Sequence, residues 1–217
     1  MKKIIIFDLD GTLLDTLPDL HKAVNFALSN FKMPNRTIEQ VRKDIGNGVE
    51  ALIERSVLGG NSNENYEKTL EMFKKYYQQN YDKLTLPYDG MLDTLNALKD
   101  VGYTLAVATN KIQEVATILI ERFYPGLFSY IQGDDHIVKK KPQTDMIDVI
   151  LKHFNLTKEE TLYIGDTNVD EETSINAGID YYLVTYGYRT IEEIKNSCIS
   201  TNLIKNPKDL LEKILSI

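Results

Sequence analysis

Two aspartates separated by one residue follow the first apolar run of the chain. The run Ile4-Ile5-Ile6-Phe7 lacks polar alternation, which predicts a strand buried on both faces of a parallel sheet. Asp8 and Asp10 come directly after it, and Gly11 permits a tight turn. Carboxylates this close repel each other, and a bound cation or a shared proton usually accommodates them. A lone aspartate would merely cap a turn, but the pair is a candidate for catalysis or metal binding.

Later strands of the chain also end in residues suited to phosphoryl chemistry. Thr109 and Asn110 follow a buried strand and offer a hydroxyl and nearby backbone amides to a phosphoryl oxygen. Lys141 precedes a predicted helix, and Asp166 and Asp170 stand four residues apart after another strand. Taken singly, these residues are common as helix caps or solvated charges. Together they predict one polar site to which the first two aspartates also belong.

The elements that must position these residues alternate between strand and helix. Strands are expected at 105–108, 128–133, 161–164 and 181–185, and helices at 91–99, 112–123, 142–154, 169–177 and 207–215. Pro142 is expected to open its helix, and Gly178 to cap the helix over 169–177. This alternation predicts an α/β fold with a Rossmann-like parallel sheet, and ligands bind at the carboxyl ends of such strands.

The segment from residue 16 to residue 85 has a different pattern. Apolar residues recur at helical spacing and no convincing strand is present. We therefore expect an all-helical cap at 16–85, inserted into an α/β core formed by 1–15 and 86–217. The aromatic stripe of this segment, which includes Tyr77, is expected to be the core of the cap. Crossings near Thr16 and Tyr88 suit a hinged lid.

Composition narrows the classes of partner. The chain has 217 residues and a formal net charge of −7, and its one basic run, Lys139 to Lys141, is short. Nucleic acid and anionic membranes are therefore poor candidates as partners. Cys198 is the only cysteine, which excludes an internal disulfide. With no signal peptide and no membrane-spanning stretch, a cytoplasmic protein is expected, as a monomer or weak homodimer.

The string Asp8-Leu9-Asp10-Gly11-Thr12-Leu13 resembles the first motif of the haloacid dehalogenase-like (HAD) phosphohydrolases. The order that follows, Thr-Asn, Lys-Pro and Gly-Asp-x-x-x-Asp, matches the other motifs of this family along the whole core. The resemblance implies the HAD fold, a helical cap and a small phosphorylated metabolite as substrate.

The resemblance also implies a role for each motif residue. Asp8 would attack phosphorus and become an aspartyl-phosphate, and Asp10 would act as general acid and base. Thr109 and Lys141 would neutralise the phosphoryl group. Mg²⁺ is the implied cofactor, because it prefers hard oxygen ligands. Its implied ligands are Asp8, Asp10 (through the backbone carbonyl), Asp166 and Asp170, the last directly or through water.

The cap suggests the substrate. Gly46, Asn47 and Gly48 resemble a cap stretch of phosphoglycolate phosphatase-like members of the family, as do residues 15–19 and 184–188. A glycine-flanked loop at a helix start offers amides to a small anion, although it is also an ordinary turn between helices. Together with Asn110, these three residues are the predicted substrate-binding residues. The resemblance implies hydrolysis of 2-phosphoglycolate to glycolate and phosphate.

Other functions remain open at this point. One alternative is another HAD phosphatase, acting on sugar or nucleotide phosphates or on pyrophosphate. A second is a β-phosphoglucomutase, because mutases of this family carry a cap histidine soon after the first motif and His21 lies nearby. A third is a binding module without turnover, which the filled catalytic positions do not favour.

Overall fold

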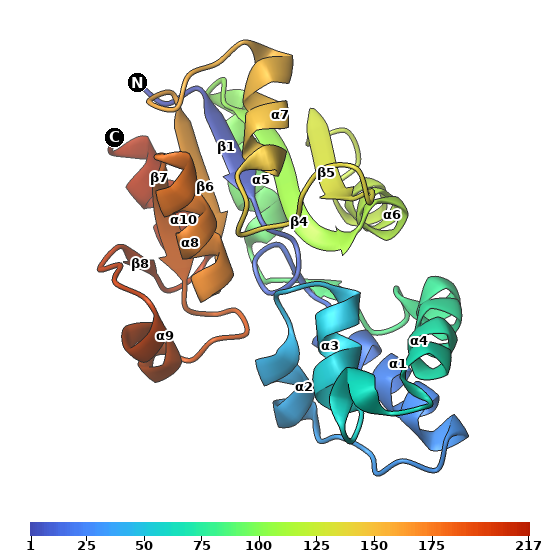
Figure 1. Cartoon of the computed structure of the whole chain (residues 1–217). Helices are drawn as coiled ribbons and strands as arrows, with labels where there is room; N and C mark the ends of the chain where they lie inside the picture. Colours follow the sequence, from blue (N-terminus) through green and yellow to red (C-terminus); the bar gives the residue numbers. More distant parts are fainter.

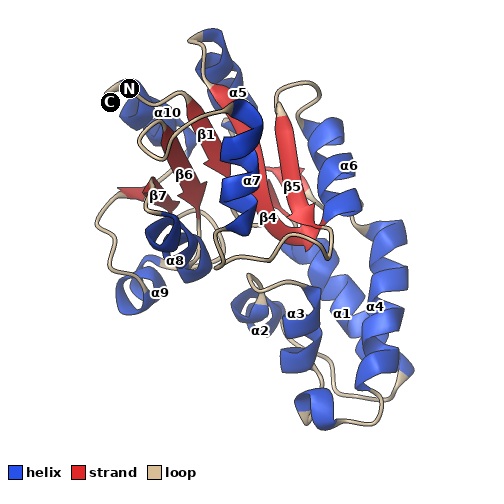
Figure 2. Cartoon of the chain, turned by 45° about the horizontal axis from the view of Figure 1, so that its top comes forward, coloured by secondary structure: helices blue, strands red, loops and turns tan.

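The computed structural model describes all 217 residues and contains an α/β unit and a helical unit (Figure 1). Both chain termini lie close together in the α/β unit, at the end remote from the helical unit (Figures 1 and 2). The helical unit stands at the end of the sheet toward which the central strands point. No helix combines the length and apolar character needed to cross a membrane.

A six-stranded parallel sheet in the order β5-β4-β1-β6-β7-β8 forms the centre of the α/β unit, which confirms the predicted Rossmann-like architecture. The central strand β1 pairs with β4 on one side and with β6 on the other, and all its residues are buried. The strands are β1 (Ile4–Phe7), β4 (Thr104–Ile112), β5 (Tyr130–Asp134), β6 (Thr161–Gly165), β7 (Asp180–Val184) and β8 (Leu203–Ile204).

Helices cover both faces of this sheet (Figure 2). Successive strand residues point to opposite faces, so Ile5 and Phe7 pack in one apolar cluster and Ile4 and Ile6 in another. The first cluster includes α5 (Met91–Asp100), α6 (Gln113–Phe123) and α10 (Pro207–Leu215), and the second α7 (Asp145–Phe154) and α8 (Asn168–Ala177). This two-sided burial explains why β1 is apolar throughout.

The helical unit has its own packed centre, which is continuous with the first sheet cluster. Its elements are α1 (Leu17–Asn30), α2 (Ile38–Asp44), α3 (Val49–Ser56), the short 3-10 helix η1 (Gly60–Ser62) and α4 (Tyr66–Asn80). Val24 and Leu28 of α1 are buried, as are Phe73 and Tyr77 of α4. The predicted aromatic stripe therefore does form core, although Tyr77 has a second contact described below.

Two short strands join the units. β2 (Leu14–Asp15) and β3 (Leu86–Pro87) pair antiparallel, so the outgoing and returning chains lie side by side. Asp19 fixes the return, because its Oδ2 accepts hydrogen bonds from the backbone N–H and the hydroxyl of Thr85. The division into core and cap that we propose, between residues 15 and 16 and between 85 and 86, falls at this paired linker.

The structure corrects several details of the predicted elements. Pro142 does not open a helix: α7 begins at Asp145, three residues later. β4 continues through Thr109 to Ile112, whereas the sequence pattern predicts that the strand ends at residue 108. Several short elements were not predicted, among them the linker strands β2 and β3, the edge strand β8 and the helix α9 (Ile191–Ser197). Gly178, by contrast, caps α8 in the left-handed conformation as expected.

Candidate active site

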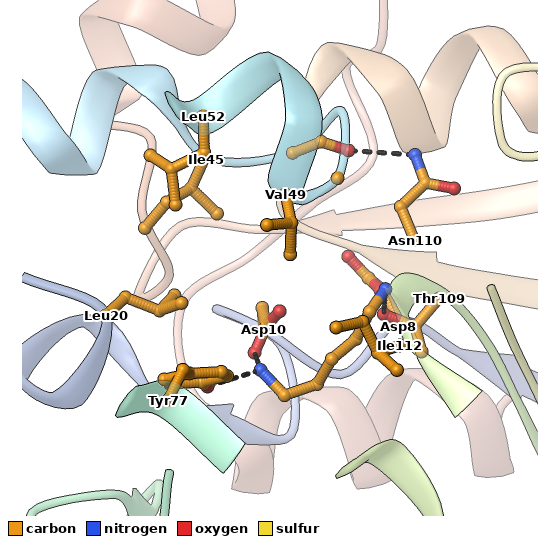
Figure 3. Close-up of a pocket in the computed structure, with 13 residues that line it drawn as sticks. Asp8, Asp10, Leu20, Ile45, Val49, Leu52, Tyr77, Thr109, Asn110 and Ile112 are labelled. Carbon is orange, nitrogen blue, oxygen red and sulfur yellow. Dashed lines mark hydrogen bonds and ion pairs between the residues drawn. The ribbon is translucent and has the colours of Figure 1, made fainter. Parts of the chain in front are cut away.

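The predicted polar residues gather at the carboxyl end of the sheet. Asp8, Asp10, Thr109 and Asn110 line a cavity that faces the helical unit (Figure 3). Asp8 follows β1, and Asp166 follows β6, its neighbour in the sheet. Thr109 lies in β4 on the other side of β1. Lys141 comes from the loop between β5 and α7, and Asp170 from the first turn of α8. Parallel strands thus bring together residues that are far apart in the chain.

Lys141 is the cation at the centre of this group. Its Nζ lies 3.0 Å from Asp8 Oδ1 and 2.7 Å from Asp170 Oδ1, and the lysine is only 3 % exposed. The same ammonium donates a hydrogen bond of 2.9 Å to the hydroxyl of Tyr163. Lys141 is therefore held by three partners, with one face against the predicted nucleophile.

Asp8, Asp166 and Asp170 form a buried carboxylate cluster in which one oxygen from each lies within 4.8 Å of the others. Burial raises the pKa of Asp8 to about 6, against the opposing effect of Lys141. Burial and the nearby carboxylates of Asp170 and Asp8 also raise the pKa of Asp166 well above its usual value. One ammonium thus does not balance three carboxylates. A hard divalent cation with oxygen ligands, such as Mg²⁺, fits this donor set.

Asp166 is fixed by glycines on both sides. Its Oδ2 accepts a 2.7 Å hydrogen bond from the backbone N–H of Tyr188. A Cβ atom on Gly11, whose φ is +84°, would lie 2.4 Å from Asp166 Oδ2. A Cβ atom on Gly187 would lie 2.5 Å from Asp166 Cβ and 2.3 Å from the carbonyl oxygen of Gly11. Only glycine fits at these two positions.

Asp170 is both a helix cap and a site residue. Its Oδ2 accepts hydrogen bonds from the hydroxyl and backbone N–H of Thr167 at the start of α8. Its Oδ1 faces Lys141. Burial opposes ionisation of this carboxyl, but Lys141 and the hydrogen bonds from Thr167 together outweigh burial and lower the pKa of Asp170. The helix-cap and metal-site interpretations of this residue are therefore compatible.

The side chain of Asp10 stands apart from the carboxylate cluster, although it lines the same cavity as Asp8. Its Oδ1 accepts a 2.6 Å hydrogen bond from the hydroxyl of Thr16 and lies 2.8 Å from Lys111 Nζ. This placement suits a side chain that exchanges protons and leaves only its backbone carbonyl to a metal.

Lys111 is a site residue that the sequence interpretation missed. It is 5 % exposed, and its Nζ donates to Asp10 at 2.8 Å and to the hydroxyl of Tyr77 in the cap at 2.7 Å (Figure 3). Burial alone would lower the pKa of Lys111, but Asp10 and Tyr77 together outweigh burial and raise that pKa. Lys111 could have been identified from the sequence, because it directly follows Thr109 and Asn110 in the same strand.

Thr109 and Asn110 both line the cavity, but they differ in how much of their hydrogen-bonding capacity is available to a ligand. The Asn110 amide nitrogen donates to the carbonyls of Gly46 and Lys141, each at 3.0 Å, and its oxygen accepts from the backbone N–H of Lys141. Asn110 therefore joins the lysine loop to the cap. Thr109 is buried beside Asp8, and its hydroxyl oxygen accepts only a long hydrogen bond of 3.4 Å from the backbone N–H of Lys111, so its O–H can donate to a ligand.

Of the three predicted cap residues, two line the cavity and one does not. Gly46 and Gly48 line the cavity, and Gly48 immediately precedes α3. Asn47 is not among the lining residues, and its side-chain oxygen accepts a 2.9 Å hydrogen bond from Arg55. The structure thus brings the backbone of this loop to the site but turns the Asn47 side chain elsewhere.

The cavity between core and cap is small, about 40 Å³. Its core side carries the polar groups described above, whereas the side chains on its cap side are Leu20, Ile45, Val49, Leu52 and Tyr77, whose hydroxyl accepts the hydrogen bond from Lys111 (Figure 3). His21 does not line it; its Nε2 lies 3.0 Å from the carbonyl oxygen of Arg36 within the cap. The site therefore combines a polar floor with an apolar roof and suits a compact anion.

Ion pairs and hydrogen bonds hold the cap over the core. Arg42 of α2 forms two hydrogen bonds to Glu193 of α9, at 2.9 and 2.8 Å. Arg189 of the core donates to the carbonyls of Arg42 and Ile45. Lys140, next to Lys141, pairs with Glu50 of α3 at 3.0 Å. The structure is thus a closed arrangement of the two units.

Comparison with known proteins agrees with this geometry. The family model described as haloacid dehalogenase-like hydrolase matches residues 5–184. Phosphoglycolate phosphatase 1 of Pseudomonas aeruginosa is 35% identical, with 97% of this chain and 79% of the relative covered. The phosphoglycolate phosphatase of Aquifex aeolicus is 34% identical, with 97% and 95% covered.

The fold has a close counterpart among solved structures. A predicted phosphoglycolate phosphatase from Haemophilus somnus superposes with a TM-score of 0.90 at 30% identity, covering 98% of each chain. The match includes the α/β unit and the helical unit. On the matched residues and the shared fold, the chain belongs to the haloacid dehalogenase-like hydrolases and is a phosphatase of their phosphoglycolate phosphatase-like branch.

Proposed function

We propose that this phosphatase hydrolyses 2-phosphoglycolate to glycolate and phosphate through a phosphorylated Asp8, with Mg²⁺ as cofactor. One observation carries the proposal. Asp8 lies 3.0 Å from the Lys141 ammonium and shares a small cavity with a second, separate carboxylate, Asp10. A nucleophile, a neutralising cation and a proton carrier are thereby present in one site.

The two oxygens of Asp8 have different surroundings. Oδ1 accepts a 2.7 Å hydrogen bond from the backbone N–H of Leu9 and lies 3.0 Å from Lys141 Nζ. Oδ2 receives no hydrogen bond from the protein. We assign Oδ2 as the attacking atom: it forms the bond to phosphorus, the P–O bond to glycolate breaks, and an aspartyl-phosphate results.

Asp10 acts as general acid in the first step and as general base in the second. In its protonated form it donates a proton to the leaving glycolate oxygen, and the resulting carboxylate accepts a proton from the water that attacks the aspartyl-phosphate. Breakage of that P–O bond releases phosphate and restores Asp8. Lys141 and the Thr109 hydroxyl face the phosphoryl group during both transfers.

The residues suited to hold Mg²⁺ are Asp8, Asp166, Asp170 and the backbone carbonyl of Asp10. The ion, when bound, would offset the charge of the phosphoryl oxygens, which otherwise repel a carboxylate nucleophile. The chain itself supplies the rigid frame for it, because Asp166 and Asp170 are held by backbone and hydroxyl donors.

The choice of substrate has two supports. Relatives at 34–35% identity bear the name phosphoglycolate phosphatase. The cavity is small and its roof is apolar, so the hydroxyl groups of a sugar phosphate would be buried without partners. The alternative of a β-phosphoglucomutase gains no support, because His21 lies outside the cavity.

Phosphate release tests the proposal. The wild-type chain is expected to hydrolyse 2-phosphoglycolate faster than an aryl phosphate or a hexose phosphate, to need added Mg²⁺, and to lose activity in EDTA. Asp8→Asn is expected to be inactive. In a separate labelling experiment, the wild type is expected to carry bound phosphate that is stable in acid and released by hydroxylamine. Activity in Asp8→Asn, or equal rates on all three substrates, contradicts the proposal.

A further inference from the structure

Lys111 carries a charge whose position the phosphoryl chemistry described above does not require. Among the residues that line the cavity, the charged ones are Asp8, Asp10 and Lys111. Lys141, the ammonium beside Asp8, is not part of this lining and already faces two carboxylates. Lys111 is therefore the one cation on the cavity wall.

The hydrogen bonds of Lys111 leave room for a further partner. An ammonium has three N–H donors. Two of them are used, by Asp10 at 2.8 Å and by the Tyr77 hydroxyl at 2.7 Å. The third is available to a ligand in the cavity. Because Thr109 and Lys111 line the same cavity, a ligand whose phosphoryl group sits at Thr109 has its remaining atoms close to this ammonium.

The rest of the wall strengthens the case for an anion at this point. Leu20, Ile45, Val49 and Leu52 offer no polar side-chain atom to the non-phosphoryl part of a substrate. A carboxylate buried there without a partner would be strongly disfavoured, whereas a charge-assisted hydrogen bond to an ammonium is favourable. The only strong side-chain partner for such a carboxylate is Lys111.

We infer that Lys111 is the specificity-determining residue that binds the carboxylate of a small phosphorylated hydroxy acid. It thereby selects this class over phosphoesters that lack a carboxylate. The inference rests on the proposed function, since it concerns the same site. It also gives Lys111 a link to the cap, because Tyr77 of α4 holds the same ammonium. Carboxylate binding and cap closure then favour each other.

The test compares two substrates of nearly equal shape. Phosphate release is measured for 2-phosphoglycolate and for its uncharged amide, 2-phosphoglycolamide, and kcat/KM is expressed as a ratio. The wild type is expected to prefer the carboxylate. Lys111→Gln, which keeps hydrogen-bonding capacity toward Asp10 and Tyr77 but loses the charge, is expected to reduce that ratio roughly 10- to 100-fold. Lys111→Arg is expected to retain part of the preference.

A matched control separates selection from general damage. Lys140→Gln removes a half-buried lysine that also joins core to cap, through Asp134 and Glu50, without lining the cavity. It is expected to leave the ratio unchanged, even where both rates fall. A ratio that stays constant in Lys111→Gln while both rates fall makes Lys111 a support for Asp10 only, and overturns the inference.

The wild type alone provides a further check if Lys111→Gln fails to fold. Equal kcat/KM values for the carboxylate and the amide overturn the role of Lys111 but leave the proposed phosphatase chemistry standing. Failure to hydrolyse either substrate, together with turnover of other phosphoesters, overturns the proposed substrate and the inference with it. A preference for the carboxylate in the wild type supports both.

Discussion

Lys141 and Asp170 form a buried ion pair at 2.7 Å, and the Asp170 carboxylate also caps helix α8. The orientation of a helix is thereby coupled to the position of the lysine that faces Asp8. A buried pair of this kind adds little net stability compared with apolar residues, but loss of one partner is costly because the other charge remains buried. The pair is therefore better explained by positioning than by stability.

Replacement of Asp170 by asparagine tests this coupling. Asp170→Asn is expected to lower the free energy of unfolding by about 3–5 kcal/mol, because Lys141 loses one of its two counter-charges. Activity is expected to fall by at least tenfold. Urea unfolding and phosphate release measure the two effects.

The control for this variant is Asp148→Asn, the same change at an exposed position of α7. It is expected to alter stability by less than about 0.5 kcal/mol. Equal stability of the two variants would show that the Lys141–Asp170 pair does not restrain the site.

The raised pKa of Asp8 predicts how stability depends on pH in the metal-free protein. Burial raises this pKa from 3.8 to about 6, so the folded state binds the proton more tightly than the unfolded state. The contribution of Asp8 to the free energy of unfolding is therefore expected to fall by roughly 3 kcal/mol as pH rises from about 4 to about 6. Urea unfolding in EDTA across this range measures it.

Two comparisons accompany this experiment. Asp8→Asn has no ionisable group at this position, so its stability is expected to change less between pH 4 and pH 6, the window given by the pKa of about 6. Saturating Mg²⁺ is expected to stabilise the wild type most at the upper end of the range, where the carboxylates are ionised. Parallel curves for the wild type and Asp8→Asn in EDTA contradict the assigned charge imbalance.

Most of the site was predictable because its residues follow strands. Asp8 and Asp166 directly follow their strands and Thr109 lies in the carboxyl-terminal half of β4, and parallel strands necessarily bring these parts to one edge of the sheet. Lys111 was missed for two reasons. The pattern indicates that β4 ends before it, and its role depends on Tyr77, a cap residue whose placement no local pattern reveals.

The misplaced helix start has a local cause. Proline favours the first turn of a helix, so Pro142 suggested one, but the backbone on its N-terminal side is held by the site. Asn110 binds both the N–H and the carbonyl of Lys141, and the chain turns before α7 begins at Asp145. Helix α9 did leave a signal, since Thr190 and Glu193 form a capping box.

Gly187, which packs against the side chain of Asp166, allows the position of Asp166 to be tested. Gly187→Ala would place a Cβ atom 2.5 Å from Asp166 Cβ, too close for either group to stay in place. We expect loss of activity, weaker Mg²⁺ binding by calorimetry and a lower melting temperature. Gly59→Ala is the comparison, because φ is +84° there but no atom lies within 4 Å. It is expected to cost about 1–2 kcal/mol of backbone strain and leave Mg²⁺ affinity unchanged. Equal Mg²⁺ affinity in both variants contradicts the proposed role of Asp166.

The Arg42–Glu193 contact predicts how firmly the cap closes. Arg42 holds the pKa of Glu193 at about 2, so the pair persists at neutral pH and is lost only as pH falls below about 4.5 toward 2. Glu193→Gln removes the charge, and because Glu193 is partly exposed we expect less than about 1 kcal/mol of lost stability.

The larger effect of Glu193→Gln is expected in binding. With the cap less firmly held, KM is expected to rise two- to threefold at low salt, while kcat changes little because Glu193 does not line the cavity. High salt weakens the pair in the wild type as well, so the difference is expected to shrink there. Glu192→Gln, at an exposed neighbour on α9, is the matched control. If both variants give the same KM across salt concentrations, this contact does not contribute to closure, and the hydrogen bonds of Arg189 to the carbonyls of Arg42 and Ile45 remain to hold the cap.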